Sequence, residues 1–336
     1  MRFLGWRRGL AGFLFAFLLA ATSAARAGAD TQSIDTTGSP VVFAQLQAGV
    51  ITVHTWNRSD VQIDADPTVN FRHVDRVPPN LPPAFTFFAQ TIDTPDGPLV
   101  LPPEPFLIQP LDASPHDAVV FDGYGNLTIT VPSGTPLLVT RVGQGEVSID
   151  GYHGGTFFST VRGGMLRLND VSGTGGLQVN NGPVIVRNST FDRVRARTGR
   201  GSMFFENCNA RQIEATSLTG SIIYDNGSFQ PGLARFESER GNIALGIARG
   251  GAQIDAHSGN GRVLSEGSFQ SGPVVTATSG RGAVMYYNGS IRAHPNLRRE
   301  LPIRAERPKG MRPMPVRTPR TPSRMPFGKK VPERPI

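Results

Sequence analysis

A glycine followed by a short alternating apolar segment recurs about every twenty residues through roughly half of the chain. The segments begin at Gly125 (GNLTI), Gly145 (GEVSI), Gly164 (GMLRL), Gly182 (GPVIV), Gly201 (GSMFF), Gly220 (GSIIY), Gly241 (GNIAL), Gly261 (GRVLS) and Gly282 (GAVMY), at spacings of 18 to 21 residues. A fixed period of this length is typical of stacked units that are each too small to bury their own apolar face. No other feature of the sequence constrains the fold as strongly.

Within each unit the apolar residues alternate with a period of two, which predicts strands and not helices. Leucine-rich repeats have a similar period, but they need an L-x-x-L-x-L-x-x-N frame that these units lack. Alanine recurs five residues before the glycine, and serine or threonine recurs three residues before it. Such columns predict that each unit lies in register on its predecessor. We therefore expect an all-β fold, a parallel β-solenoid whose units span residues 121–292.

Two positions of each unit are expected to form its corners. One is the glycine that opens the second strand, where a positive φ or a close approach of the neighbouring backbone excludes larger residues. The other lies six residues later and is occupied by Asp170, Asn188, Asn207, Asn226 and Asn288. Asn and Asp tolerate the left-handed conformation, and stacked Asn side chains can bond from one unit to the next.

The two ends of the chain differ in composition from the repeat. Residues 1–27 combine a basic start, an apolar run too short for a membrane span and small residues around a cleavage site, which is typical of a secretory signal peptide. No later segment is long and apolar enough to span a membrane, so we expect an exported protein in the periplasm, at the cell surface or outside the cell. Residues 293–336 hold ten prolines, and twelve basic residues against three acidic ones, which predicts a disordered tail of net charge +9.

We expect this tail to hold the protein electrostatically to an anionic polymer of the cell surface, such as an envelope polysaccharide. The basic residues of this tether are Arg298, Arg299, Arg304, Arg307, Lys309, Arg312, Arg317, Arg320, Arg324, Lys329 and Lys330. A spacer that only keeps the protein in solution is the alternative. Nucleic acid is not an expected partner, because the protein is exported and the tail lacks interleaved aromatic residues for stacking on bases.

Two regions precede the repeat. Residues 28–66 contain two alternating apolar segments that predict strands, which either begin the solenoid or cap it. Residues 67–120 form an insertion rich in proline and aromatic residues. We expect an irregular loop folded over one side or end of the solenoid; a binding loop is the alternative.

The order of these motifs resembles a known family. A signal peptide is followed by G-x-I-x-V-x-x-W-N-R-x-x-V-x-I at residues 49–63, by the connection V-P-S-G at 131–134, and then by the glycine-spaced strands. Over roughly residues 40–290 this order is similar to that of the putative adhesin family, a bacterial family of unknown function. The resemblance implies a right-handed β-solenoid in the cell envelope or outside the cell. The insertion and the basic tail depart from the family pattern.

Candidate catalytic residues lie five positions after the glycine. Neighbouring units would place the carboxyl groups of Glu206 and Asp225 about 5 Å apart, near the separation found in retaining glycosidases, with Arg187 one unit away. The alternative is that these are solvated residues beside the Asn column, and the lack of an aromatic platform favours it. A weaker candidate is a stripe of Arg200, Arg240 and Arg281, which precede unit glycines and could hold an anion.

No cofactor is expected. The six histidines share no column, and the sequence contains no metal-binding or phosphate-binding motif. Cys208 is the single cysteine, and we expect a small buried side chain there in place of a reactive thiol.

The sequence thus predicts an exported, non-enzymatic β-solenoid that presents a long binding surface at the cell envelope. The first alternative is a β-helix enzyme that cleaves a polysaccharide through Glu206 and Asp225. The second is a structural protein that associates with itself through the ends of its solenoid.

Overall fold

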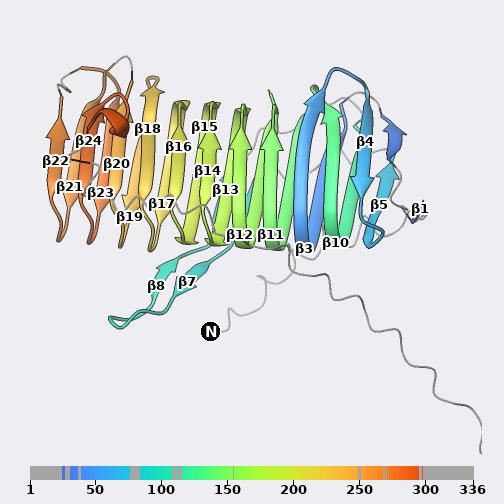
Figure 1. The fold of residues 1–336 in the computed structure, drawn as a ribbon, viewed down its shortest axis with the longest axis horizontal. Coiled ribbons are helices and arrows are strands. Elements are labelled where there is room, and N and C mark those ends of the chain that lie inside the picture. The colour runs from blue at the N-terminus through green and yellow to red at the C-terminus, as the bar shows by residue number, and fades with distance from the viewer. Residues whose placement is uncertain are drawn as a thin grey trace, which may run out of the picture. The chain divides into compact units, whose positions relative to one another are not determined.

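The structure is a computed structural model that describes residues 25–26, 31–36, 39–75, 84–107, 111, 116–153, 155–248, 251–267, 269, 271–294 and 297. The described residues are all-β: they form strands joined by turns, and one short 3-10 helix, η2 (Ile291–Ala293). Most of the strands belong to one sheet, which closes on itself and in which most pairs are parallel (Figure 1). No helix in the described part of the chain is long and apolar enough to cross a membrane.

The predicted signal peptide lies outside the described residues except for β1 (Ala25–Arg26), which pairs with a strand near residue 70. The predicted tail also lies outside them, except for its first two residues and Leu297. All eleven residues proposed as the tether, Arg298 to Lys330, are therefore outside the described residues.

Each repeat unit contributes one long strand or two consecutive short ones. The long strands are β3 (Val41–Trp56), β10 (Ala118–Pro132), β11 (Leu137–Asp150) and β12 (Thr156–Asn169). The pairs of short strands are β13 (Ser172–Asn181) and β14 (Val184–Arg187), β15 (Thr190–Arg200) and β16 (Met203–Glu206), β17 (Asn209–Ser217) and β18 (Ile222–Phe229), β19 (Ala234–Ser238) and β20 (Ile243–Ile247), β21 (Gln253–Ser258) and β22 (Val263–Glu266), and β23 (Val274–Ser279) and β24 (Val284–Asn288). Neighbouring strands are parallel and one repeat apart, so that Leu137 lies beside Thr156 and Thr156 beside Thr174.

The units do not follow chain order at either end of the sheet. β3 lies between β10 and β11, although it precedes both in the chain. At the other end β19 and β20 pair with β23 and β24, and the earlier unit β21–β22 lies beyond them. The prediction that each unit lies on its predecessor is wrong for these units. Repeat columns cannot detect the exchange, because Ala256 and Ala277 offer the same side chain to a neighbouring unit.

The glycine column forms a continuous stack and shows the same exchanged order. In space it runs Gly125, Gly49, Gly145, Gly164, Gly182, Gly201, Gly220, Gly241, Gly282 and Gly261. A Cβ atom on any of these after the first would overlap the carbonyl oxygen of the glycine before it. Positive φ is a second constraint at the early corners, for example 141° at Gly145 and 140° at Gly182, but not at Gly220 or beyond in this stack. Close approach of the neighbouring backbone is thus the constraint that all of them after Gly125 share.

At the later corners, where the glycine does not have a positive φ, a serine three residues before the glycine holds the turn. The Ser279 hydroxyl accepts a hydrogen bond from the Gly282 amide at 2.7 Å and donates one to the carbonyl of Gly241, in the neighbouring unit, at 2.9 Å. Ser258 makes the equivalent pair of bonds: its hydroxyl accepts from the Gly261 amide of its own unit and donates to the Gly282 carbonyl of the neighbouring unit. The serine column noted in the sequence therefore holds both the turn and the contact between units.

Antiparallel strands cover the β10 end of the sheet. β4 (Asp60–Ala65) and β5 (Val69–Val74) pair with β10, and β2 (Gln32–Asp35) extends β4. Region 28–66 thus supplies both β3, a unit of the stack, and part of this cover. Region 67–120 supplies β5 and the first residues of β10 in addition to the insertion.

The interior is filled by inward side chains of the stacked units and of β4 and β5, which form one continuous apolar cluster. Cys208 belongs to it: the side chain is fully buried, and its sulfur lies 3.5 Å from the Glu206 carbonyl and 3.7 Å from that of Val186. Burial raises the pKa of Cys208 to about 12, so the thiol is protonated at neutral pH. The cysteine is a packing residue, as its surroundings in the sequence indicated.

Candidate functional site

The insertion forms a regular cover over one surface of the sheet. Its strands are β6 (Ala84–Phe87), β7 (Gln90–Ile92), β8 (Leu99–Leu101) and β9 (Glu104–Leu107). They form two antiparallel pairs: β6 with β9, and β7 with β8, which Figure 1 labels. We call residues 84–107 the strap. The expectation of an irregular loop is therefore wrong, whereas its position over one side of the sheet agrees with the expectation.

Aromatic rings hold the strap to the sheet. Phe157 and Phe158 are neighbours on β12, but Phe157 packs in the interior while Phe158 belongs to a second buried cluster on the outer surface. The Phe158 ring stacks on Phe85 at a centroid distance of 4.9 Å and contacts Phe87 at 5.3 Å. Phe106 of β9 completes the cluster at 6.4 Å. The strap thus encloses an apolar core of its own.

Polar contacts extend this attachment along the sheet. The Gln178 side chain accepts from the Phe88 amide at 2.8 Å and donates to the Phe88 carbonyl at 2.7 Å. At the strap turn, Asp96 accepts hydrogen bonds from Arg281 at 2.8 Å and from Arg240 at 2.9 Å. These guanidinium groups, Arg281 foremost, lower the pKa of Asp96 below its usual value. Two of the three arginines suggested as an anion stripe therefore bind a carboxylate of the chain itself.

The second segments of the early units form a surface that the strap does not cover. One outward position, three residues after the glycine, is in register across five adjacent strands. It is occupied by Thr52 of β3, Ser148 of β11, Arg167 of β12, Ile185 of β14 and Phe204 of β16. Each of these side chains is partly or fully exposed, although its neighbours along the strand are buried. We call these five residues the exposed row.

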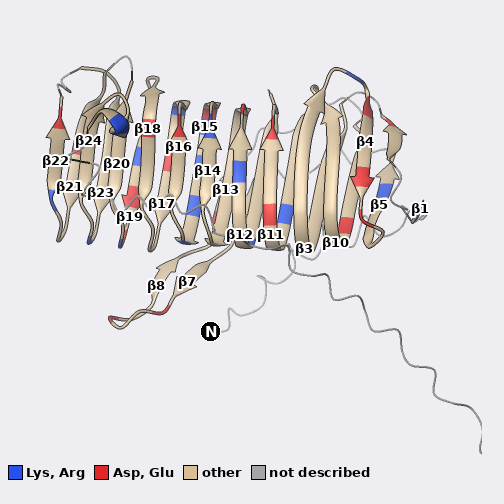
Figure 2. Ribbon diagram, in the orientation of Figure 1, with Lys and Arg blue, Asp and Glu red and all other residues tan. Residues whose placement is uncertain are grey.

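Acidic and basic residues both occur along these strands and do not gather into a patch of one sign (Figure 2). The exposed row itself is polar at Thr52 and Ser148, basic at Arg167, and apolar at Ile185 and Phe204. The row therefore offers apolar and aromatic contact area at one end and hydrogen-bonding groups at the other.

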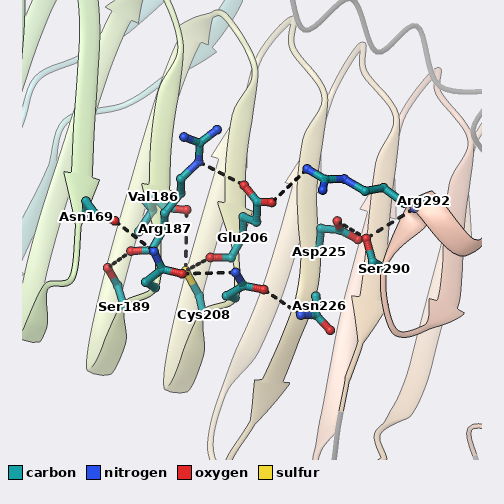
Figure 3. Close-up of polar contacts among 12 residues, drawn as sticks. Asn169, Val186, Arg187, Ser189, Glu206, Cys208, Asp225, Asn226, Ser290 and Arg292 are labelled. Carbon is teal, nitrogen blue, oxygen red and sulfur yellow. Dashed lines mark hydrogen bonds and ion pairs between the residues drawn. The ribbon is translucent and has the colours of Figure 1, made fainter.

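An amide ladder borders the exposed row (Figure 3). Asn226 donates to Asn207 at 2.7 Å, Asn207 to Asn188 at 3.2 Å, Asn188 to Asn169 at 3.1 Å and Asn169 to Asp150 at 2.7 Å. The sequence predicted bonds among Asn188, Asn207 and Asn226, and these occur; Asp170 and Asn288, the other members of the turn column, lie outside the ladder. Their neighbours explain why: the bond from Asn188 goes to Asn169, and at the Asn288 corner the positive φ belongs to Gly289.

The left-handed backbone conformation occurs at four positions of the Asn and Asp column that the sequence predicted to form corners. Asp170, Asn188, Asn207 and Asn226 have φ between 51° and 56°, and among the described residues no other residue except glycine has positive φ. Each of these residues turns the chain at the end of a second strand segment, where the short polar side chain tolerates the conformation. The ladder and the corners therefore share three residues.

The structure places the three candidate catalytic residues side by side. Glu206 and Asp225 are register partners on β16 and β18, and the Arg187 Nε atom lies 3.0 Å from a Glu206 oxygen. Arg292 approaches the other Glu206 oxygen at 3.4 Å (Figure 3). Glu206 is thus a partly exposed carboxylate between two exposed arginines.

Asp225 is not the solvated residue that the sequence alternative assumed, because only 9% of it is exposed. One carboxylate oxygen accepts from the Ile291 amide at 2.8 Å and the Tyr287 hydroxyl at 3.1 Å. The other accepts from the Ser290 hydroxyl at 2.8 Å. Asp225 therefore anchors the segment that leaves β24 and folds back as η2. The sequence offered no signal for these donors, which lie 62 to 66 residues further along the chain.

Among the described residues, no group of three or more His, Cys, Asp or Glu side chains is arranged to hold a metal ion. His294, beyond η2, instead bonds the Glu266 carboxylate at 2.6 Å and the Asn288 carbonyl at 2.8 Å. Two further residues of the predicted tail range, Ala293 and Leu297, are also placed, as the end of η2 and as a buried side chain. The packed part of the chain thus extends beyond residue 292.

Comparison with known proteins leaves the family open. No protein-family model and no curated protein matches the chain. A crystal structure described as "a putative cell adhesion protein" from Clostridium sporogenes ATCC 15579 aligns with 77% of this chain and 98% of its own, at 11% identity and a TM-score of 0.24. A TM-score this low supports no conclusion about the fold or the function of this chain. Membership of the adhesin family stays a prediction.

Proposed function

We propose that the protein is an exported, non-enzymatic β-solenoid that binds an extended polymer at the cell envelope through the exposed row. Support for the solenoid comes from the pairing of parallel strands one repeat apart and from the continuous glycine stack. In a solenoid each repeat forms one turn, and the outward residues of successive turns then form straight rows at about 4.8 Å spacing. The right-handed sense is part of the proposal and follows the usual handedness of parallel crossover connections.

The observation that supports the binding function is that two surfaces of the sheet are covered by other segments of the chain and the exposed row is not. The strap occupies the outer surface of the first strand segments, and η2 packs on Asp225 near the last units. Between them the exposed row remains open over five adjacent strands, with Phe204 and Ile185 available for apolar or stacking contact and Arg167 for a charged group. A flat row of repeated positions fits a ligand that is itself extended and repetitive.

Export and tethering by the basic tail complete the proposal. A chain segment of charge +9 in an otherwise mildly acidic protein would hold the solenoid near anionic envelope polymers and leave the exposed row free.

The polysaccharide-cleaving enzyme is the second candidate, and the contacts of Asp225 argue against it. A retaining glycosidase needs two carboxyl groups that both reach the scissile bond. Here both oxygens of Asp225 are engaged by donors of the chain itself, whereas Glu206 alone is accessible. Reducing-sugar release from envelope polysaccharide by the purified protein, abolished by Glu206→Gln, would establish the enzyme and overturn the proposal.

A binding experiment tests the role of the exposed row. The mature protein is incubated with envelopes isolated from the cells that produce it, and the bound fraction is measured at increasing protein concentration. We expect the double variant Ile185→Ser, Phe204→Ser to bind at least ~10-fold more weakly, because two apolar contacts of about 1 kcal/mol each are lost. A matched control, Val100→Ser, Tyr124→Ser, removes two residues exposed at 54% and 51% elsewhere and should bind normally. Equal binding by both double variants would refute the role of the exposed row.

Cell fractionation tests the tether separately. Deletion should begin at Ile303, where a second unit of the chain starts, because Ile291 and Leu297 are buried and belong to the packed part. We expect high salt or this deletion to release the protein from the envelope fraction, since screening weakens electrostatic attachment. A protein found in the cytoplasm would contradict export itself.

A further inference from the structure

The two ends of the sheet differ in whether further strands pair with their edge strands. At one end β4 and β5 pair with β10, and the inward side chains Leu127 and Ile129 are fully buried. At the other end the last strands are β21 and β22, at the left margin of the sheet in Figure 1. In the described part of the chain, β21 pairs only with β23 and β22 only with β24. Among the described residues, nothing pairs with the outer edge of either strand of the last unit.

The interior is open at this end. Val263 occupies the inward position two residues after its glycine and is 45% exposed, whereas Val284 and Ile243 at the same position of the next units are fully buried. Ile254 and Ala256 of β21 are half-buried, although their partners on β23 are fully buried. Phe269 is also half-buried, and its ring packs edge-on against Tyr286 at 5.1 Å. We call Ile254, Ala256, Val263 and Phe269 the open end.

The open end lacks two residue types that commonly protect an edge. Neither β21 (QIDAHS) nor β22 (VLSE) contains lysine or proline. Asp255 pairs with His257 on the same strand at 2.9 Å, and Glu266 pairs with His294 at 2.6 Å, so the acidic groups of both strands already have partners within the chain. Each of these two acidic groups thus has a basic partner that offsets its charge.

The exchanged order of the last units sets where the chain leaves this end. The chain leaves the sheet from β24, which is the inner of the last two units; the next residues bind Asp225 of β18, and His294 then bonds Glu266 of β22 in the terminal unit. In a stack that followed chain order, the outgoing segment would instead start at the terminal unit. The outgoing segment thus contacts the terminal unit at Glu266, while Val263 of the same strand stays 45% exposed.

We propose that the open end is the interface of a two-fold dimer, in which it docks on the open end of a second copy of this chain. A partner must present two strands with an apolar interior between them, because a single peptide strand paired with β21 or β22 would leave Val263 and Phe269 exposed. The β10 end has no such surface, since β4 and β5 already pair with its edge. The matching surface is therefore the same open end. A two-fold contact between identical ends places strands of the two copies antiparallel and is closed, so assembly stops at two.

Sedimentation equilibrium of the full mature chain between about 1 and about 300 µM tests the proposal, which is independent of what the exposed row binds. We expect a dimer, and we expect Val263→Lys to raise the dimer dissociation constant at least ~100-fold, because two buried valines are replaced by two buried charges. Val100→Lys places the same charge at a site that is 54% exposed on the strap and should dimerise normally. Far-UV circular dichroism verifies that each variant is folded, and Ile254→Lys is a second probe of the open end should Val263→Lys not fold.

Three results would overturn the proposal. The first is a monomer at every concentration. The second is a dimer whose dissociation constant is unchanged by both Val263→Lys and Ile254→Lys, which would place the contact elsewhere. The third is an assembly that continues to grow beyond two copies, since a closed two-fold contact cannot extend.

Discussion

Replacing Asp225 by alanine should release the segment that follows β24 from the sheet. Asp225 accepts three hydrogen bonds from that region, from the Ile291 amide, the Ser290 hydroxyl and the Tyr287 hydroxyl, at 2.8, 2.8 and 3.1 Å. The carboxylate is almost completely buried, so these donors cannot turn to water while the segment stays packed. The substitution therefore removes the common acceptor of three separate donors.

The expected cost follows from the kind of bond that is lost. A hydrogen bond to a charged group contributes about 1.5–3 kcal/mol, so three such bonds set an upper bound of about 4.5–9 kcal/mol. Opening of the segment lets water solvate the Ser290 hydroxyl and the Ile291 amide and recovers part of this free energy. We therefore expect Asp225→Ala to lower the free energy of unfolding by about 2–4 kcal/mol, and the melting temperature by roughly 5–10 °C.

Hydrogen–deuterium exchange is the most direct assay, because a stack of repeats can open locally while the remainder stays folded. Residues 289–294 should lose protection in Asp225→Ala, while the amides of β12 and β14 should keep it. Glu206→Ala is the matched control: its ion pairs with Arg187 and Arg292 are exposed, and the change should cost less than about 1 kcal/mol. Unchanged protection of 289–294, with an unfolding free energy within about 0.5 kcal/mol of the original, would refute the anchoring role of Asp225.

Three further predictions concern the ladder, the strap and the pH response. In chemical denaturation, Asn207→Ala should destabilise the protein by about 1–2 kcal/mol more than Asn207→Gly. Both variants lose the hydrogen bonds of the amide ladder, but only alanine is strained at a φ of 56°. Equal losses of unfolding free energy would contradict this prediction. Phe158→Ala should cost about 3–5 kcal/mol and expose residues 84–107 to exchange or proteolysis, with Phe204→Ala, half-exposed on the opposite surface, as the control that leaves the strap protected. The Asn288 carbonyl and then Glu266 raise the pKa of His294, so its stabilisation is complete below the unfolded pKa of about 6.5 and is lost as the pH rises through the higher folded value. Protection of residues 288–294, corrected for intrinsic exchange, should accordingly fall as the pH rises above about 6.5 and become independent of pH in His294→Ala.

Much of the architecture follows from local chemistry that the sequence displays. The glycines mark corners because a Cβ atom at Gly145 or Gly182 would overlap a neighbouring carbonyl, and this requirement recurs at every turn of the stack. The Asn column marks left-handed corners because few other side chains tolerate that conformation. Cys208 follows from its place among alternating apolar residues. These features depend only on each unit and its nearest neighbour. Because the units repeat, the same residue types recur many times in the sequence and can be recognised there.

The tertiary structure decided what a repeat cannot encode. The exchange of the last two units is invisible in the columns, because Ala256 and Ala277 have the same side chain and fit the same neighbour. The strap contacts join Asp96 to Arg240 and Arg281 across more than 140 residues, and no local pattern records such a distance. Asp225 differs from Glu206 only because the segment after β24 returns to cover it. Contacts between segments far apart in the sequence depend on the three-dimensional course of the chain. A single sequence contains no repeating pattern that records this course.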